Sequence, residues 1–327
     1  MIDRRSILAL MALCPLAPPA AAWAQQGGKT PVVGILHSAT GPRAATVDIT
    51  RQGLRELGYI DGQNIVFEVR WAAEKPDAFP RLAADLIQRK VDVILVSGPA
   101  GIRAARDATD SIPIVALDLE SDPIQAGFAR SLAQPGGNIT GCFLDQPGLT
   151  GKWLELIEDV VPGARRLAVL TDPTTGPWQL DAIKSAAEKL RIELQVLEVR
   201  RSVELDQTLG TGVKSGSRAL VQLSSPLFDL PFAKRIADFT LKHRWPAISM
   251  FRRFAEAGGL MVYGPNQPEY YRRLSSYIDK ILKGAKPGDL PVEQPTKFDF
   301  VINLKTASII GLALPQSLVA RADQVIQ

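Results

Sequence analysis

The chain has 327 residues, a formal net charge of +4 at pH 7 and a hydrophobic fraction of 46%. This length is enough for two domains of about 150 residues each, and the small, evenly spread charge does not indicate nucleic-acid binding. The chain has only two histidines and two cysteines and no HxxxH or CxxC spacing, so the sequence does not indicate a dedicated metal site.

The first 24 residues have the pattern of an export signal. Arg4 and Arg5 form a positive start, residues 7–16 are uncharged and apolar, and Ala22-Trp23-Ala24 is a small-x-small cleavage pattern. We therefore expect cleavage after Ala24, a mature chain that starts at Gln25, and localisation in the periplasm. The paired arginines fit the twin-arginine route only loosely, so Sec and twin-arginine export both stay open.

A membrane or lipid anchor is the alternative interpretation of this segment. Prolines interrupt its apolar run, which falls short of the ~20 residues that a spanning helix needs. Cys14 follows Leu13, where a lipidation site needs a small residue, and precedes Pro15. We expect Cys142 to be the single cysteine of the mature chain, buried as a small apolar residue and without an intramolecular disulfide.

After the predicted signal, short β-branched runs alternate with segments of helical periodicity. In the first half, strands are predicted at residues 32–36, 65–69, 91–96 and 113–117, with helices at 47–57, 79–90 and 101–108. Such a series indicates a parallel sheet with right-handed crossover connections.

The pattern then starts again. Predicted helices at 153–160, 178–190 and 232–243 alternate with predicted strands at 167–170, 192–199, 219–223 and 247–249. A helix at 268–282 and a strand at 298–302 follow, and the glycine-rich segment 134–141 is the candidate for a first hinge strand. The fold class predicted is α/β, with two Rossmann-like lobes whose parallel sheets are joined by a multi-strand hinge. We expect signal peptide 1–24, lobe 1 at 30–141 plus 252–288, and lobe 2 at 142–251 plus 289–327.

Enzyme motifs are absent from the sequence. No GxGxxG follows the first predicted strand, and no GxSxG occurs. Residues 210–216 resemble a phosphate loop, but their spacing is wrong and they precede a strand. We therefore predict that the chain is not an enzyme and takes no cofactor; an exported hydrolase on the same fold would need a clustered Ser/His or metal site.

Several blocks carry a family resemblance, and the most specific lie near the end of the chain. They are Arg51–Asn64, Pro135–Gly141, Phe254–Gly264, Leu290–Lys305 and Leu314–Ile326. Together they resemble the ABC transporter substrate-binding protein family, which has the type I periplasmic-binding fold and includes receptors for aromatic amino acids such as tryptophan.

The resemblance implies two lobes, joined by three crossovers, that close on a small solute. It also implies delivery of the solute to a membrane permease powered by a cytoplasmic ATPase, action as a monomer, and no nucleic-acid partner. A periplasmic ligand-sensing subunit for a membrane signalling kinase is the alternative function, because the fold and cleft would be the same. The solute is expected to be an amino acid or an aromatic or other organic acid.

In this fold, the loops at the carboxyl ends of the strands converge on the cleft. The predicted ligand-binding residues are His37, Ser38, Thr40, Ser97, Gly98, Asp118, Glu120, Thr171, Asp172, Trp178, Ser224, Ser225, Phe228, Phe251 and Arg252. Hydroxyls and helix N-termini can hold a carboxylate, acids can pair an ammonium, and aromatic rings can stack on an apolar ligand. The near-neutral pKa of a histidine would make His37 a pH-sensitive contact. Family relatives carry an acidic and amide pair where this chain has Ser224-Ser225-Pro226-Leu227-Phe228, so the resemblance does not name the solute.

Overall fold

A computed structural model describes residues 29–38, 45–73, 75–229 and 232–327. The predicted export signal and Thr40 lie outside the described residues. Residues Pro31–Gln327 form one compact unit. Among the described residues, no helix is both long and apolar enough to cross a membrane.

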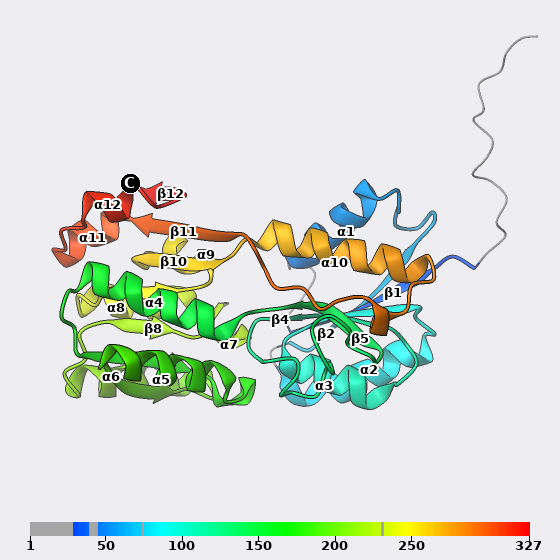
Figure 1. Cartoon of the computed structure of the whole chain (residues 1–327), viewed down its shortest axis with the longest axis horizontal. Helices are drawn as coiled ribbons and strands as arrows, with labels where there is room; N and C mark the ends of the chain where they lie inside the picture. Colours follow the sequence, from blue (N-terminus) through cyan, green and yellow to red (C-terminus); the bar gives the residue numbers. More distant parts are fainter. Residues whose placement is uncertain (1–28, 39–44, 74, 230–231) are drawn as a thin grey trace, which may run out of the picture. The chain divides into compact units, whose positions relative to one another are not determined.

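The first sheet contains five parallel strands in the order β2-β1-β3-β4-β5 (Figure 1). The strands are β1 (Val32–His37), β2 (Val66–Trp71), β3 (Val93–Ser97), β4 (Ile114–Asp118) and β5 (Ile139–Phe143). Helices α1 (Ala45–Glu56) and α10 (Gln267–Leu282) cover one face, and α2 (Phe79–Gln88) and α3 (Pro99–Ala108) cover the other. This sheet with its four helices is called the first lobe below.

Alternation along the strands explains this layering. Val33 and Ile35 of β1 pack in a core cluster with Leu54 of α1 and Leu274 of α10, whereas Leu36 joins a second cluster on the opposite face. Because both faces of a parallel sheet are covered by helices, its strands are apolar along most of their length. Every residue of β4 is buried, including Asp118 at its end.

The second sheet has seven strands in the order β12-β11-β10-β9-β8-β6-β7. The strands are β6 (Arg166–Thr171), β7 (Glu193–Glu198), β8 (Leu220–Gln222), β9 (Ala247–Ser249), β10 (Met261–Pro265), β11 (Phe298–Asn303) and β12 (Gln324–Ile326). All neighbours are parallel except β10 and β11. The predicted parallel sheets are therefore confirmed apart from this one antiparallel pair.

Helices also pack against the second sheet. They are α4 (Gln146–Val160), α5 (Trp178–Leu190), α6 (Leu205–Lys214), α7 (Pro226–Asp229), α8 (Ala233–Lys242), α9 (Arg252–Glu256), α11 (Leu304–Ile310) and α12 (Gln316–Val319). Trp153 of α4 is completely buried, and its Nε1 donates a hydrogen bond of 2.7 Å to the backbone oxygen of Tyr263. This sheet with its helices is called the second lobe below.

The chain passes between the lobes at three places: from β5 to α4, from β10 to α10, and from the segment beside β5 to β11. At the third, Glu293 donates its backbone N–H to Gly141 and accepts the N–H of Phe143 through its carbonyl. The second crossing lies later than predicted. We expected lobe 1 to resume at residue 252, but α9 packs on β10 and β11, and β10 pairs with β9 and β11 in the second sheet. The chain returns to the first lobe only with α10.

Candidate functional site

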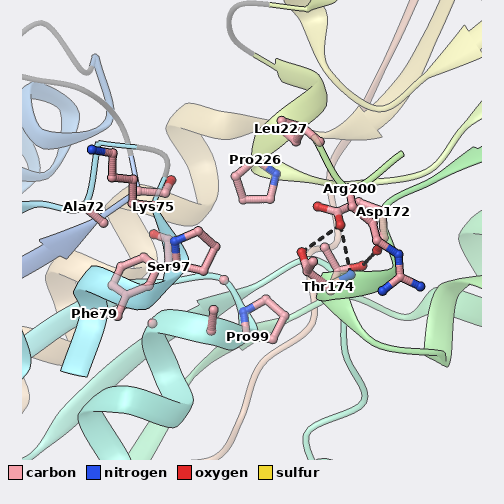
Figure 2. Close-up of a pocket in the computed structure, with 16 residues that line it drawn as sticks. Ala72, Lys75, Phe79, Ser97, Pro99, Asp172, Thr174, Arg200, Pro226 and Leu227 are labelled. Carbon is pink, nitrogen blue, oxygen red and sulfur yellow. Dashed lines mark hydrogen bonds between the residues drawn. The ribbon is translucent and has the colours of Figure 1, made fainter. Parts of the chain in front are cut away.

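A pocket lies where the carboxyl ends of strands from both sheets face each other (Figure 2). Its volume is about 110 Å³, several times the ~10–15 Å³ that one water molecule needs. Its lining residues are Ser38, Ala72, Lys75, Pro76, Phe79, Ser97, Gly98, Pro99, Ala100, Gly101, Asp172, Thr174, Thr175, Arg200, Pro226 and Leu227. The pocket can therefore hold a small organic molecule.

The first lobe supplies the wall formed by the end of β3 and the start of α3. Ser97 is the last residue of β3, and Gly98 follows with φ +79°, a left-handed conformation that favours glycine. Gly98 is the N-cap of α3, and because glycine has no side chain, no side-chain group caps this helix. The first residues of α3, Pro99, Ala100 and Gly101, line the pocket. The positive end of a ten-residue helix thus points at the pocket, which favours an anionic group there.

The second lobe supplies the loop after β6. Asp172 caps the short 3-10 turn Pro173–Thr175: its Oδ1 accepts hydrogen bonds from Thr174 N at 2.9 Å and Thr174 Oγ1 at 2.7 Å. Its Oδ2 accepts a bond of 2.7 Å from Ser225 Oγ. Figure 2 shows Asp172 turned toward Thr174, with Arg200 beside it. The carboxylate therefore serves first to fix the shape of its own loop.

Two buried carboxyl groups lie at the end of β4, next to the pocket wall. Asp118 accepts backbone N–H bonds from Glu120 at 2.9 Å and Ser121 at 3.0 Å, and a bond from Ser121 Oγ. Glu120 Oε1 accepts a bond of 2.6 Å from Ser224 Oγ, which belongs to the second lobe. Glu120 Oε2 accepts the N–H of Leu119 at 3.2 Å. The Glu120–Ser224 bond therefore links the two lobes directly.

Burial raises the pKa of both carboxyl groups. The pKa of Glu120 rises to about 8 because its carboxyl is desolvated and because the charge of Asp118 lies next to it. Desolvation also raises the pKa of Asp118, against the lowering effect of its hydrogen bonds. At neutral pH the pair therefore shares a proton.

Comparisons with known proteins agree with this architecture. The family model of the ABC transporter substrate binding protein matches residues 33–326. The chain belongs to this family.

Among its relatives, the chain is 25% identical to the tyrosine-binding protein of Clostridioides difficile (strain R20291) over 264 residues, which is 80% of this chain and 75% of the relative. Two solved structures share its fold. A conserved domain protein from Vibrio cholerae is 24% identical with a TM-score of 0.83, and an ABC domain in complex with L-Trp from Streptococcus pneumonia is 23% identical with a TM-score of 0.82. Both comparisons cover 91% of this chain and 100% of the other.

Of the residues predicted for the site, the structure of this substrate-binding protein brings four into the pocket lining: Ser38, Ser97, Gly98 and Asp172. Four others form the hydrogen-bonded network behind it: Asp118, Glu120, Ser224 and Ser225. Gln179 of α5 fixes this network, because its side chain accepts the N–H of Ser224 at 2.7 Å and donates to the carbonyl of Ser224 at 2.8 Å.

The other predicted residues lie elsewhere in this substrate-binding protein. Phe228 is completely buried in the core of the second lobe, because α7 turns its apolar side toward the sheet. Phe251 is likewise in a core cluster. Arg252 is exposed at the start of α9, where it forms an ion pair of 3.1 Å with Glu256. Thr171 is buried at the end of β6.

Trp178 and His37 also stand outside the pocket lining. The ring of Trp178 covers Gly176, so closely that a Cβ there would lie 2.0 Å from the ring. His37 packs against Trp71 with ring centroids 5.5 Å apart and borders a separate cavity of about 10 Å³. Burial lowers the pKa of His37 to about 4. This lowered pKa differs from the near-neutral value predicted for His37, because burial desolvates the ring.

Several lining residues of this substrate-binding protein were not predicted. Lys75, Phe79 and Arg200 come from segments that follow β2 and β7, and Pro226 and Leu227 begin α7. The rule that strand-end loops form the site applies to β2 and β7 as well, and it could have found Lys75 and Arg200. Among the described residues, no group of three or more histidines, cysteines or acids is placed to hold a metal ion.

Proposed function

We propose that this chain is the exported solute-binding receptor of an ABC importer. It captures a small organic solute that carries a carboxylate, between its two lobes, and delivers it to a membrane permease and its ATPase. The observation that carries the proposal is the pocket walled by strand-end loops of both sheets, in a chain whose family is that of ABC transporter substrate-binding proteins. The sequence pattern of residues 1–24 supports export to the periplasm.

The chemistry of the lining supports this class of solute. Phe79, Pro99, Pro226 and Leu227 form apolar walls, which bury an apolar or aromatic body. The N-terminus of α3 and the hydroxyl of Ser97 are suited to a carboxylate without bound water. The printed names of two relatives, a tyrosine-binding protein and a domain in complex with L-Trp, make aromatic amino acids and aromatic acids the first compounds to test.

For the lobe boundaries we propose an assignment that follows the sheets. Lobe 1 consists of residues 31–143 together with 267–293, and lobe 2 consists of 146–265 together with 298–327. Closure of the lobes on the solute then places the linking Glu120–Ser224 bond beside it. In this proposal the binding residues are those that line the pocket, with the Asp118, Glu120, Ser224 and Ser225 network as their support.

A thermal-shift screen tests the receptor function. A solute present at 100 times its dissociation constant stabilises the protein by about 2.7 kcal/mol, a shift of several degrees in Tm. Ala100→Trp places a large ring in the pocket and should abolish the shift. Ala108→Trp, at the exposed far end of the same helix, should retain it. Absence of any shift across amino acids, organic acids and sugars would refute the proposal.

A further inference from the structure

We propose that the pocket selects an organic carboxylate whose apolar or aromatic body carries no ammonium group, in preference to the matching α-amino acid. This inference rests on the proposed function, because it names the solute class of the same site. It follows from the charges around the pocket and from the state of each carboxyl group nearby.

Among the residues that the structure describes, the charged side chains of the lining are two cations and one anion. Lys75 comes from the segment after β2 and Arg200 from the segment after β7, so each lobe contributes one cation. Within the described ranges, Lys75 forms no ion pair, and the ion pair of the Arg200 side chain is with the exposed Glu198, at 3.4 Å. Asp172 is the acid among the described lining residues. Two cations around one anion favour a solute of net negative charge, whereas a zwitterionic amino acid is neutral.

Asp172 is poorly placed to bind an ammonium. Its carboxylate already accepts three hydrogen bonds, two from Thr174 and one from Ser225. It is only 5% exposed, and its bonds hold the loop that forms the second-lobe wall. An incoming ammonium carries three donors and would find at most one lone-pair position on this group.

The other two acids predicted for an ammonium do not reach the pocket. Asp118 is completely buried and accepts three hydrogen bonds from Glu120 and Ser121. Both oxygens of Glu120 accept bonds, from Ser224 and from Leu119. Because the pKa of Glu120 is raised to about 8, its carboxyl is mostly neutral at pH 7 and offers little attraction to a cation.

Selection against the ammonium then follows from desolvation. Enclosing a charged group without enough acceptors carries a large free-energy penalty, whereas the carboxylate keeps its cations and the body of the solute keeps its apolar walls. Sites with unmatched polar groups discriminate strongly between close analogues. We expect the deaminated acid to bind on the order of a hundredfold more tightly than its amino acid.

Matched pairs of compounds test this inference by isothermal titration calorimetry at pH 7. The pairs are L-phenylalanine with 3-phenylpropanoate, L-tyrosine with 3-(4-hydroxyphenyl)propanoate, and L-tryptophan with indole-3-propanoate, with benzoate and phenylacetate as shorter acids. Tighter binding of the acid in at least one pair, or of a shorter acid over all three amino acids, is the expected result. If the amino acid binds as tightly as its acid or more tightly in every pair, and no shorter acid binds more tightly than all three amino acids, the inference is overturned and the receptor function is left intact. Absence of binding by every one of these compounds also overturns the inference. In that case, a thermal shift with a solute of another class would still support the receptor function.

Three variants separate the roles of the charges. Lys75→Gln and Arg200→Gln should each weaken binding of the preferred acid about tenfold, since each removes one cation at the pocket. Lys242→Gln, an exposed lysine on α8 outside the pocket, is the matched control and should change nothing. Asp172→Asn should not weaken binding of the amino acids more than binding of the acids, provided its Tm shows that the loop is intact. A selective loss of amino-acid binding in folded Asp172→Asn would mean that this carboxylate binds the ammonium, and would overturn the inference.

Discussion

Replacing Glu120 with glutamine should remove a fall in stability between pH 6.5 and 8. In the folded protein, burial and the neighbouring Asp118 raise the pKa of Glu120 from 4.5 to about 8. In the unfolded chain the same carboxyl returns to about its ordinary value. Between these two values the Glu120 carboxyl holds one more proton in the folded state than in the unfolded state.

The sign and size of the effect follow from proton linkage. A folded-state pKa that is raised gives stability that is fully present below pH 4.5 and is lost as the pH rises through 8. One proton corresponds to about 1.4 kcal/mol for each pH unit. His37 acts in the opposite direction, because burial lowers its pKa from 6.5 to about 4 and its contribution is lost as the pH falls from 6.5 to 4. At pH 6.5 half of the unfolded chains still carry a proton on His37, so this residue adds only about 0.4 kcal/mol between pH 6.5 and 8. Its effect is the same in the variant and in the unchanged protein, so the fall due to Glu120, about 2 kcal/mol from pH 6.5 to 8, stands out in their difference.

Urea unfolding, followed by tryptophan fluorescence at pH 6.5, 7.25 and 8, measures this fall. The difference in free energy of unfolding between pH 6.5 and 8 should be about 2 kcal/mol smaller in Glu120→Gln than in the unchanged protein. Glu256→Gln is the matched control, because Glu256 is exposed and pairs with Arg252 on the surface. Equal pH dependence in Glu120→Gln and the unchanged protein would refute the proton-sharing account of this buried pair.

Two further predictions concern the strand that joins the lobes. Gly141 has φ +140°, and a Cβ there would lie 2.0 Å from the backbone oxygen of Ala116, so Gly141→Ala should cost more than about 3 kcal/mol of unfolding free energy in urea. Gly137→Ala, which meets nothing within 4 Å, should cost less than about 1 kcal/mol, and similar losses for both would contradict the steric argument. Burial raises the pKa of the Cys142 thiol to about 12, so in a Cys14→Ser background a thiol reagent at pH 8 should label Cys142 only after urea is added. Rapid labelling of the folded protein would show that this strand opens.

Periodicity along the chain was enough to predict most of the architecture. The helix predicted at 178–190 and the strand at 247–249 have those same bounds in the structure. A proline precedes each element, Pro177 before the helix and Pro246 before the strand, and marks where it begins. The two-lobe α/β class followed from the repeated alternation of strands and helices, and the structure confirms it.

The second crossing between lobes was harder to place, for a physical reason. Residues 261–265 form a short strand whose apolar side chains would suit either sheet. Its position is decided by pairing with β9 and with β11, which lies more than thirty residues later in the chain. Local sequence contains no information about partners at that distance, so the predicted boundary at 252 fell too early.

At the candidate site, too, some features could be predicted from the sequence and others could not. That Ser97, Gly98 and Asp172 line the pocket could be predicted because each directly follows or ends a strand. The direction of a side chain within a loop could not: Ser224 and Ser225 bond to acids near the pocket, whereas Phe228, three residues later, enters the core as α7 begins. Half a turn of helix reverses the direction of a side chain, and the residue at which a helix starts is not visible in composition.

The late position of α10 has a consequence for how this chain folds. All five strands of the first sheet are complete by Phe143, yet one face of that sheet is covered by a helix that begins at Gln267. Tyr59 Oη, just after α1, donates a hydrogen bond of 3.0 Å to Asp279 of that helix, across 220 residues of sequence. Until α10 is synthesised, α1 is the helix that covers this face of the first sheet, and by then strands β6 to β10 of the second sheet have been made. Contacts across so long a stretch of sequence slow folding, so the core of the first lobe is completed only when most of the chain is available.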